Sequence, residues 1–121
     1  NTIRKMNKSS LLMVNISNDT WFGNSIGPYQ HLSITRVRAL ENNKWTIRST
    51  NDGVSAIISN KGTIVDYIDK GRSDILEGHV ELTYESSFYS LIGYKFIYLL
   101  SFMIVFIIIS LSLWKNHLKA L

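Results

Sequence analysis

The chain has no cysteine and only one proline in 121 residues. Without cysteine it can form neither a disulfide framework nor a zinc site with cysteine ligands. Charge is also sparse, with thirteen basic and nine acidic residues and a net charge of +4. The basic residues are scattered apart from a short group at Arg4, Lys5 and Lys8, whereas nucleic-acid binding needs a concentrated basic face. We therefore expect no nucleic-acid partner.

Common catalytic and cofactor motifs are missing as well. The three histidines, His31, His79 and His117, lack the spacing of metal ligands. No serine stands in a Gly-x-Ser-x-Gly motif, and Gly23 and Gly27 fit neither the Walker pattern nor the dinucleotide fingerprint. The sequence therefore predicts no metal and no cofactor.

The strongest physical signal is an uncharged run of nineteen residues from Phe96 to Trp114. At about 1.5 Å per residue, a helix of this length spans the roughly 30 Å hydrocarbon layer of a membrane. Lys115, His117 and Lys119 follow at once, and the positive-inside rule assigns such an end to the cytoplasm. The pattern predicts an extracytoplasmic domain over residues 1–93, and a transmembrane helix with a short basic cytoplasmic tail over residues 94–121.

The remaining residues alternate between strand and helix signals, which predicts a layered α/β domain. Short apolar or alternating runs indicate strands at residues 11–16, 45–48, 54–59 and 63–67, with an extended segment at 75–84. Pro28 opens a helix that runs to Asn42. A 100° step along this helix places Tyr29, Leu32, Val37, Ala39 and Leu40 on its apolar side. Arg36 falls inside this stripe, so we expect it to be buried against a carboxylate or carbonyl partner.

A polar and aromatic cluster, Asn18-Asp19-Thr20-Trp21-Phe22, follows the first predicted strand. Open α/β sheets place ligands beyond the ends of their strands, which makes this cluster a candidate binding site. Asn18 and Asp19 can hold the shape of the loop, while Trp21 and Phe22 can line an apolar cleft. Alternatively, both aromatic residues belong to the core and the polar pair forms only an Asx turn.

Residue order in three segments resembles one known family. Residues 15–41, including Gly27-Pro28-Tyr29-Gln30-His31, residues 48–53 and the membrane-spanning tail resemble the late part of the nitrilase-like domain of bacterial apolipoprotein N-acyltransferases. The resemblance implies part of a four-layer α-β-β-α sandwich followed by one C-terminal transmembrane helix. The glutamate, lysine and cysteine that react in this family precede the matching stretch. We therefore expect a C-terminal piece with no catalytic residues, inactive by itself.

The resemblance also implies a reaction and its participants. In the family, a thiolate takes an acyl chain from a phospholipid, and the thioester then passes it to the diacylglyceryl-cysteine of an apolipoprotein in the bacterial inner membrane, without a cofactor. It places Trp21 near the bound lipid or acylated cysteine, with Phe22 as a further lining residue and Asn18 and Asp19 as shape-holders. His31 either donates a hydrogen bond to the active-site loop or bonds back to loop carbonyls.

Two other functions remain open from the sequence. A non-catalytic, tail-anchored envelope protein would also lack the reacting residues and carry the span. A fragment of a nitrilase-type amidase would share the fold, but such proteins are usually soluble. For Arg36, Glu41 and Arg48 we expect a structural network that joins helix to sheet, in preference to contact with a substrate headgroup.

Overall fold

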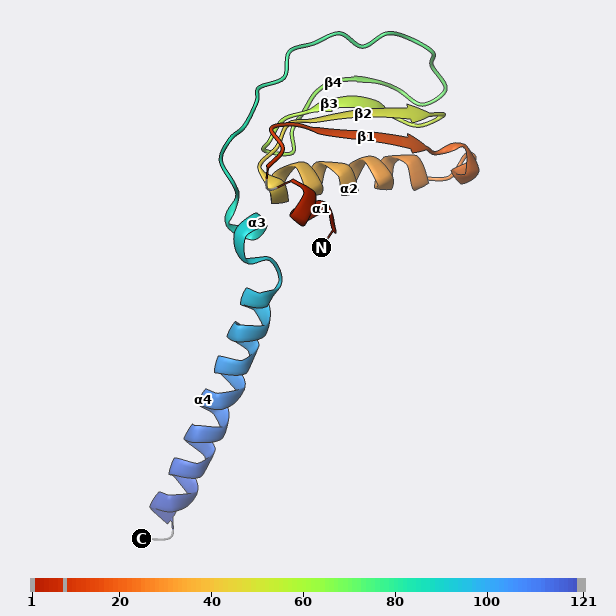
Figure 1. Ribbon diagram of the computed structural model, residues 1–121. Coiled ribbons are helices and arrows are strands. Elements are labelled where there is room, and N and C mark those ends of the chain that lie inside the picture. The colour runs from red at the N-terminus through yellow and green to blue at the C-terminus, as the bar shows by residue number, and fades with distance from the viewer. Residues whose placement is uncertain (1, 8, 120–121) are drawn as a thin grey trace. The chain divides into compact units, whose positions relative to one another are not determined.

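The computed structural model describes residues 2–7 and 9–119, with side chains as far as Lys115. The chain divides into two compact units, Asn1–Leu91 and Ile92–Leu121. The first holds a mixed sheet with helices, and the second is dominated by one long helix (Figure 1). This mixed α/β architecture agrees with the fold class that the sequence predicts.

Four strands form the sheet in the order β1-β2-β3-β4. They are β1 Met13–Asn18, β2 Thr46–Asn51, β3 Ser55–Ile58 and β4 Ile64–Ile68. β1 and β2 pair in parallel, which requires the crossover helix between them, while β2, β3 and β4 form an antiparallel meander. The predicted hairpin of β3 and β4 is confirmed. β1 begins at Met13, two residues after the start of the strand predicted at residues 11–16.

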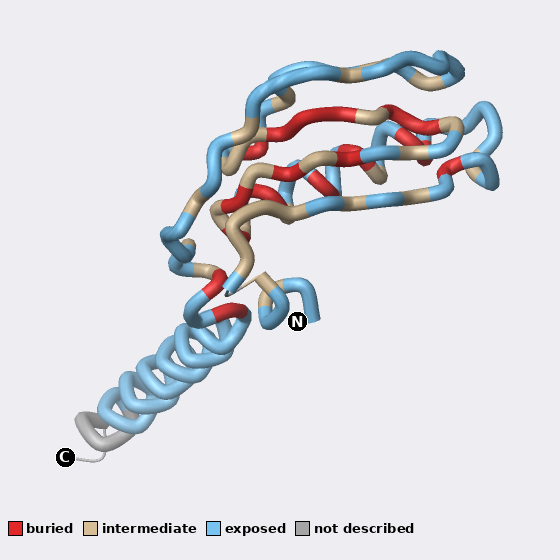
Figure 2. Tube along the Cα trace, turned by 45° about the horizontal axis from the view of Figure 1, so that its top comes forward, coloured by how far each residue is buried: buried red, intermediate tan, exposed pale blue. Residues whose placement is uncertain are grey.

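The crossover helix α2, Gly27–Asn42, has Pro28 in its first turn and ends at Asn43, which has a left-handed φ of 53°. Its extent matches the prediction, but only Leu32 and Ala39 of the five residues predicted for the apolar side are buried. Thr35 and Asn42 are buried with them, whereas Tyr29, Val37 and Leu40 are exposed. Figure 2 shows buried segments along the strands, while most of the long C-terminal helix is exposed.

Polar residues occupy the buried face of α2 because their hydrogen bonds are satisfied there. Thr35 Oγ1 donates to the His31 carbonyl and accepts from Arg48, and the Asn42 side-chain amide donates to the Arg38 carbonyl. Arg36 is exposed, contrary to expectation. Its Nε nevertheless has the expected carbonyl partner, 2.8 Å away on Gly62.

The apolar core between α2 and the sheet is small. It consists of Leu32, Ala39, Val54, Ala56 and Ile58, with Ile64 packed against it. At the turn between β2 and β3, Asp52 has a φ of 55° and Gly53 is buried. A Cβ atom at Gly53 would lie 2.4 Å from Asp19 Oδ2, so only glycine allows this close approach.

After β4, the chain continues through a long segment, residues 69–87, without a helix or strand. Thr83 donates its amide to the Leu11 carbonyl, and the Lys44 ammonium donates to the carbonyls of Thr83 and Glu85. Two short helices that the sequence pattern does not predict, α1 Thr2–Met6 and α3 Phe88–Ile92, are joined by a hydrogen bond from the Arg4 guanidinium to the Ser90 carbonyl.

The second unit contains α4, Lys95–Lys119, which covers the uncharged run. Its segment Lys95–Lys115 is long and apolar enough to cross a membrane, as judged by length and composition, and none of its residues is buried within the protein. This confirms a helix where the sequence predicts one. The side chains of residues 116–121, including His117 and Lys119 of the basic tail, lie outside the described part.

Candidate functional site

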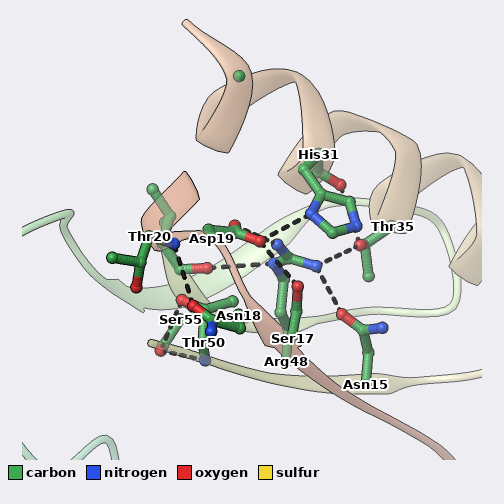
Figure 3. A network of polar contacts seen from close by, with 12 residues as sticks. Asn15, Ser17, Asn18, Asp19, Thr20, His31, Thr35, Arg48, Thr50 and Ser55 are labelled. Atoms are coloured by element: carbon green, nitrogen blue, oxygen red, sulfur yellow. Dashed lines mark hydrogen bonds and ion pairs between the residues drawn. The ribbon is translucent and has the colours of Figure 1, made fainter. Parts of the chain in front are cut away.

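Asp19 stands directly after β1, at the carboxyl end of the parallel strand pair. Its amide donates to the Asn51 carbonyl at the end of β2, and its own carbonyl accepts from the Phe22 amide. These bonds shape the following 3-10 turn, η1 Thr20–Phe22. The Asp19 side chain is completely buried and points back under α2 (Figure 3).

Arg48 of β2 supplies the charge that balances this buried carboxylate. Its Nη2 lies 2.7 Å from Asp19 Oδ2, and both side chains are 0% exposed. The other guanidinium hydrogens bond Asn15 Oδ1 at 2.5 Å, Thr35 Oγ1 at 2.9 Å and the Val54 carbonyl at 3.3 Å. The guanidinium thus joins both strands to the helix in one fixed arrangement.

The second oxygen of Asp19 is also fully engaged. Oδ1 accepts the Ser17 hydroxyl at 2.7 Å and lies 2.8 Å from His31 Nδ1. Burial by itself raises the pKa of Asp19, but hydrogen bonds from Ser17 and His31 and the positive charge of Arg48 hold it below the usual value for an aspartate. Burial lowers the pKa of Arg48, and Asp19 opposes this shift. The pair is therefore ionised at neutral pH, with each charge compensated by the other.

An open cavity of about 450 Å³ lies beside this network. Its polar wall includes three network residues, Asn15, His31 and Thr35, together with Asn7, Arg38 and Thr46. Arg38 is itself paired with Glu41, at 2.6 Å. Most of the remaining wall is apolar and comes from α1, β1 and α2, with contributions from Ile3, Met6, Leu12, Val14 and Ile34. The cavity thus has an apolar wall and a substantial polar wall, so a ligand could be held by contacts of both kinds.

The two aromatic residues of the turn have different environments. Trp21 is 81% exposed, and its ring lies 5.0 Å from that of Phe22. It does not line the cavity beside Asp19, and its exposure excludes a core role. Phe22 is half-buried against the start of α2, where a Cβ atom at Gly27 would lie 2.2 Å from its ring. Phe22 therefore packs onto the helix, while Trp21 faces solvent.

Asn18 is exposed, and its Oδ1 accepts the Thr20 amide at 3.1 Å, as expected of a residue that holds the loop shape. The expected joint network of Arg36, Glu41 and Arg48 does not form. Arg36 binds Gly62, Glu41 binds Arg38, and only Arg48 connects helix to sheet. Sequence reasoning missed that Arg48 is the partner of Asp19. One available signal was the isolated charge within a strand of apolar and β-branched residues, which requires a nearby carboxylate.

Within the described residues, no group of three or more histidine, aspartate or glutamate side chains has the arrangement of a metal site. The polar cluster at the strand ends is instead an ion pair extended by neutral hydrogen-bonding groups. Its chemistry suits rigid positioning of the turn and presentation of hydrogen-bonding atoms to the cavity.

Comparison with known proteins agrees with the resemblance seen in the sequence. The chain is 49% identical over 71 residues to an apolipoprotein N-acyltransferase of Pseudomonas paraeruginosa, which covers 59% of this chain and 14% of that protein. It is 51% identical over 69 residues to the enzyme of the same name from Pseudomonas putida, covering 57% and 14% of the two chains. For the Nitrosomonas europaea protein of this name, identity is 53% over 58 residues, covering 48% and 12%.

These alignments span only about one seventh of the relatives' length. The sequence profile of the carbon-nitrogen hydrolase family, in contrast, matches residues 1–88, well over half of the chain. The chain therefore belongs to the carbon-nitrogen hydrolase family.

Proposed function

We propose that this chain acts as part of a membrane N-acyltransferase that moves an acyl chain from a phospholipid to the N-terminal diacylglyceryl-cysteine of apolipoproteins. Similarity to proteins of that name supports the reaction class. The structural observation that carries the proposal is the buried Asp19–Arg48 pair, which fixes the turn that presents the exposed Trp21 ring, while Asn15, His31 and Thr35 of the same network line a partly apolar cavity. Such a site suits a substrate with long apolar chains.

The proposed placement follows the apolar helix. Residues 1–93 would lie outside the bacterial inner membrane as part of a four-layer α-β-β-α sandwich, and residues 94–121 would cross the membrane and end in the cytoplasm. The uncharged run from Phe96 to Trp114 within α4 and the basic residues after Trp114 support this orientation. A domain attached directly to a span rests near the bilayer, from which lipid can enter sideways.

In this mechanism, a thiolate attacks the phospholipid ester and forms a thioester, which the α-amino group of the apolipoprotein then attacks. The chain contains no cysteine, so the nucleophile would come from residues outside this sequence. The residues described here would shape the lipid site. Asp19 and Asn18 hold the turn, Phe22 packs it onto α2, and Trp21 presents an exposed ring to the lipid.

The test measures acyl transfer in the complete protein that contains this chain. The substrates are phospholipid vesicles and a diacylated lipopeptide, and triacylated product is followed by mass spectrometry. Trp21→Ala should reduce turnover while protein abundance in the membrane stays normal. Tyr84→Ala is the matched control, because Tyr84 is similarly exposed but lies in the long segment far along the chain from the turn.

The outcome separates the candidate functions. Triacylated product from the complete protein, with turnover lowered by Trp21→Ala but not by Tyr84→Ala, supports the acyltransferase. No product from a folded, membrane-inserted protein would contradict it and favour a non-catalytic anchored protein. Release of ammonia from amide substrates would instead identify an amidase. The isolated chain should form no product, because covalent catalysis without a nucleophile retains only the shape of the site.

A further inference from the structure

Buried neighbours determine which atoms in the polar part of the cavity donate hydrogen bonds and which accept them. Asp19 is held as a carboxylate by Arg48, Ser17 and His31, so both of its oxygens can only accept hydrogen bonds. His31 Nδ1, 2.8 Å from Asp19 Oδ1, must therefore carry the proton. In the neutral imidazole this leaves Nε2 unprotonated, as a hydrogen-bond acceptor.

Arg48 determines the orientation of the Asn15 side-chain amide in the same way. A guanidinium can only donate, so the Asn15 atom 2.5 Å from Arg48 Nη1 must be the carbonyl oxygen Oδ1. The Nδ2 amide of Asn15 is then left as a donor. Both residues line the cavity, and in the described part of the chain neither His31 Nε2 nor Asn15 Nδ2 has a hydrogen-bond partner. His31 and Asn15 thus present one acceptor and one donor to the cavity.

The acceptor on His31 and the donor on Asn15 together limit which chemical groups can bind. An ammonium cannot accept from Asn15, and a carboxylate cannot donate to His31, whereas a hydroxyl can do both. The lining residues also offer no free charge to balance an ion, since Arg38 is paired with Glu41. Leu12, Val14 and Ile34 belong to an apolar part of the wall that suits a hydrocarbon chain, while Asn7 and Thr46 add further polar groups. The favoured ligand is therefore a neutral alcohol on an apolar chain.

We propose that this cavity binds the hydroxyl-bearing part of a lipid, whose hydroxyl donates to His31 Nε2 and accepts from Asn15 Nδ2. If the proposed acyl transfer holds, the reaction produces a lipid with such a hydroxyl. Transfer of the acyl group to the thiol breaks the bond between the acyl carbon and the glycerol oxygen, and the thiol proton ends on that oxygen. The released lysophospholipid carries a free hydroxyl next to its remaining chain. His31 and Asn15 then act as positioning residues for this alcohol.

The first measurement needs no variant. With the full chain in lipid nanodiscs and ¹⁵N-labelled histidine, imidazole NMR correlations report which nitrogen carries the proton. In the neutral form of the ring, His31 should show a proton on Nδ1 and none on Nε2. His79, exposed in the long segment, serves as the internal reference. A neutral His31 protonated on Nε2 would overturn the assignment.

The second measurement compares ligands of equal chain length. Titration with 1-decanol, decyl methyl ether, decanoate and decylammonium is followed through the methyl resonances of Val14 and Ile34. The alcohol should bind about three- to tenfold more tightly than the ether, the range expected for a net hydrogen bond. His31→Phe should abolish this preference, and the matched His79→Phe should retain it.

Equal binding of alcohol and ether, or a preference that survives His31→Phe, contradicts the proposal. If His31→Phe does not fold, the protonation state and the ligand series on the unmodified chain still decide it. Neither experiment measures acyl transfer. A complete protein that binds the alcohol but transfers no acyl group would therefore refute only the proposed function, and active enzyme without alcohol preference would refute only this site.

Discussion

Two buried cations hold opposite edges of the sheet in different ways. Arg48 meets a carboxylate, Asp19, at the carboxyl end of β1, and both charges are fully enclosed. Lys44, just before β2, is equally buried but donates to the carbonyls of Thr83 and Glu85. At Arg48, the opposite charge of Asp19 compensates the cation, and the pair fixes the candidate site. At Lys44, only carbonyl dipoles compensate the cation, and the hydrogen bonds hold the long segment 69–87 against the sheet.

The difference is reflected in proton binding. Around Asp19, hydrogen bonds and Arg48 overcome the effect of burial and lower the pKa of the carboxyl. At Lys44, burial lowers the pKa of the ammonium, which means that the charged form is disfavoured there. The comparison suggests that removing one partner is far more damaging at the Asp19 edge than at the Lys44 edge.

The largest effect is expected from Arg48→Met. It leaves Asp19 as a buried carboxylate without its cation, which typically costs about 3–5 kcal/mol in the free energy of unfolding. Urea denaturation monitored by tryptophan fluorescence measures the loss. Arg36→Met is the matched control, since Arg36 is exposed and has a single carbonyl partner. A loss below about 1 kcal/mol for Arg48→Met would show that the network tolerates an unpaired Asp19.

A double variant, Arg48→Met with Asp19→Leu, sharpens this result by removing both charges. Because no buried charge remains, its loss of stability should be smaller than the sum of the two single losses. The coupling energy from the double-mutant cycle is the quantity to measure. Additive losses would mean that the two residues act independently, against the 2.7 Å contact between them.

A smaller effect is expected from Lys44→Met. Two hydrogen bonds to carbonyls are lost, but the penalty for burying the ammonium is also removed, so the net cost is about 1 kcal/mol. The local effect is more diagnostic. Hydrogen exchange at the Thr83 amide, which bonds the Leu11 carbonyl, should become faster. Lys61→Met, at an exposed position, should leave it unchanged.

The two edges should also respond to different pH ranges. The folded-state pKa of Asp19 lies below its reference value of 3.8, so its contribution is complete above that value and is lost as pH falls through the folded-state pKa. The folded-state pKa of Lys44 lies below 10.5, so stability rises with pH between the folded-state pKa and that value. The free energy of unfolding is measured by denaturation at several pH values. Its fall at acid pH should disappear in Asp19→Asn, and its rise at alkaline pH should disappear in Lys44→Met.

The smallest effect on stability is expected from Trp21→Ala. With 81% of its surface exposed, this side chain contributes little to folding, and the change in unfolding free energy should stay within about 0.5 kcal/mol. Thermal denaturation of the variant is the measurement. A large loss would indicate that the ring packs against part of the domain, and would weaken its proposed contact with lipid.

Features with local causes were predictable from the sequence. Pro28 and the polar pair Asn42-Asn43 bracket α2, the turn at residues 60–62 joins β3 to β4, and the uncharged run becomes α4. Hydrophobic spacing predicted only part of the buried face of α2, because Thr35 becomes acceptable in the core only when Arg48 of β2 donates to it. The short helices α1 and α3 likewise depend on contacts between distant segments, such as Arg4 with Ser90.

The site residues also divide into those with local causes and those that depend on distant contacts. Asn18 caps its own loop, and a local pattern suffices to identify that role. The importance of Asp19 depends on residues twelve and twenty-nine positions away, His31 and Arg48. No window of adjacent residues contains that information.

The separation between Asp19 and Arg48 has a consequence for how the protein folds. Twenty-nine positions must be closed into a loop before the ion pair can form, and the entropy of closing that loop is recovered only when β1, α2 and β2 are all in place. The site is therefore expected to assemble late, after the helix and the β3–β4 hairpin, whose contacts are local. Any partial unfolding that releases β1 or β2 separates Asp19, Arg48 and His31 at the same time. The pocket is therefore present only in molecules in which β1, α2 and β2 are all folded.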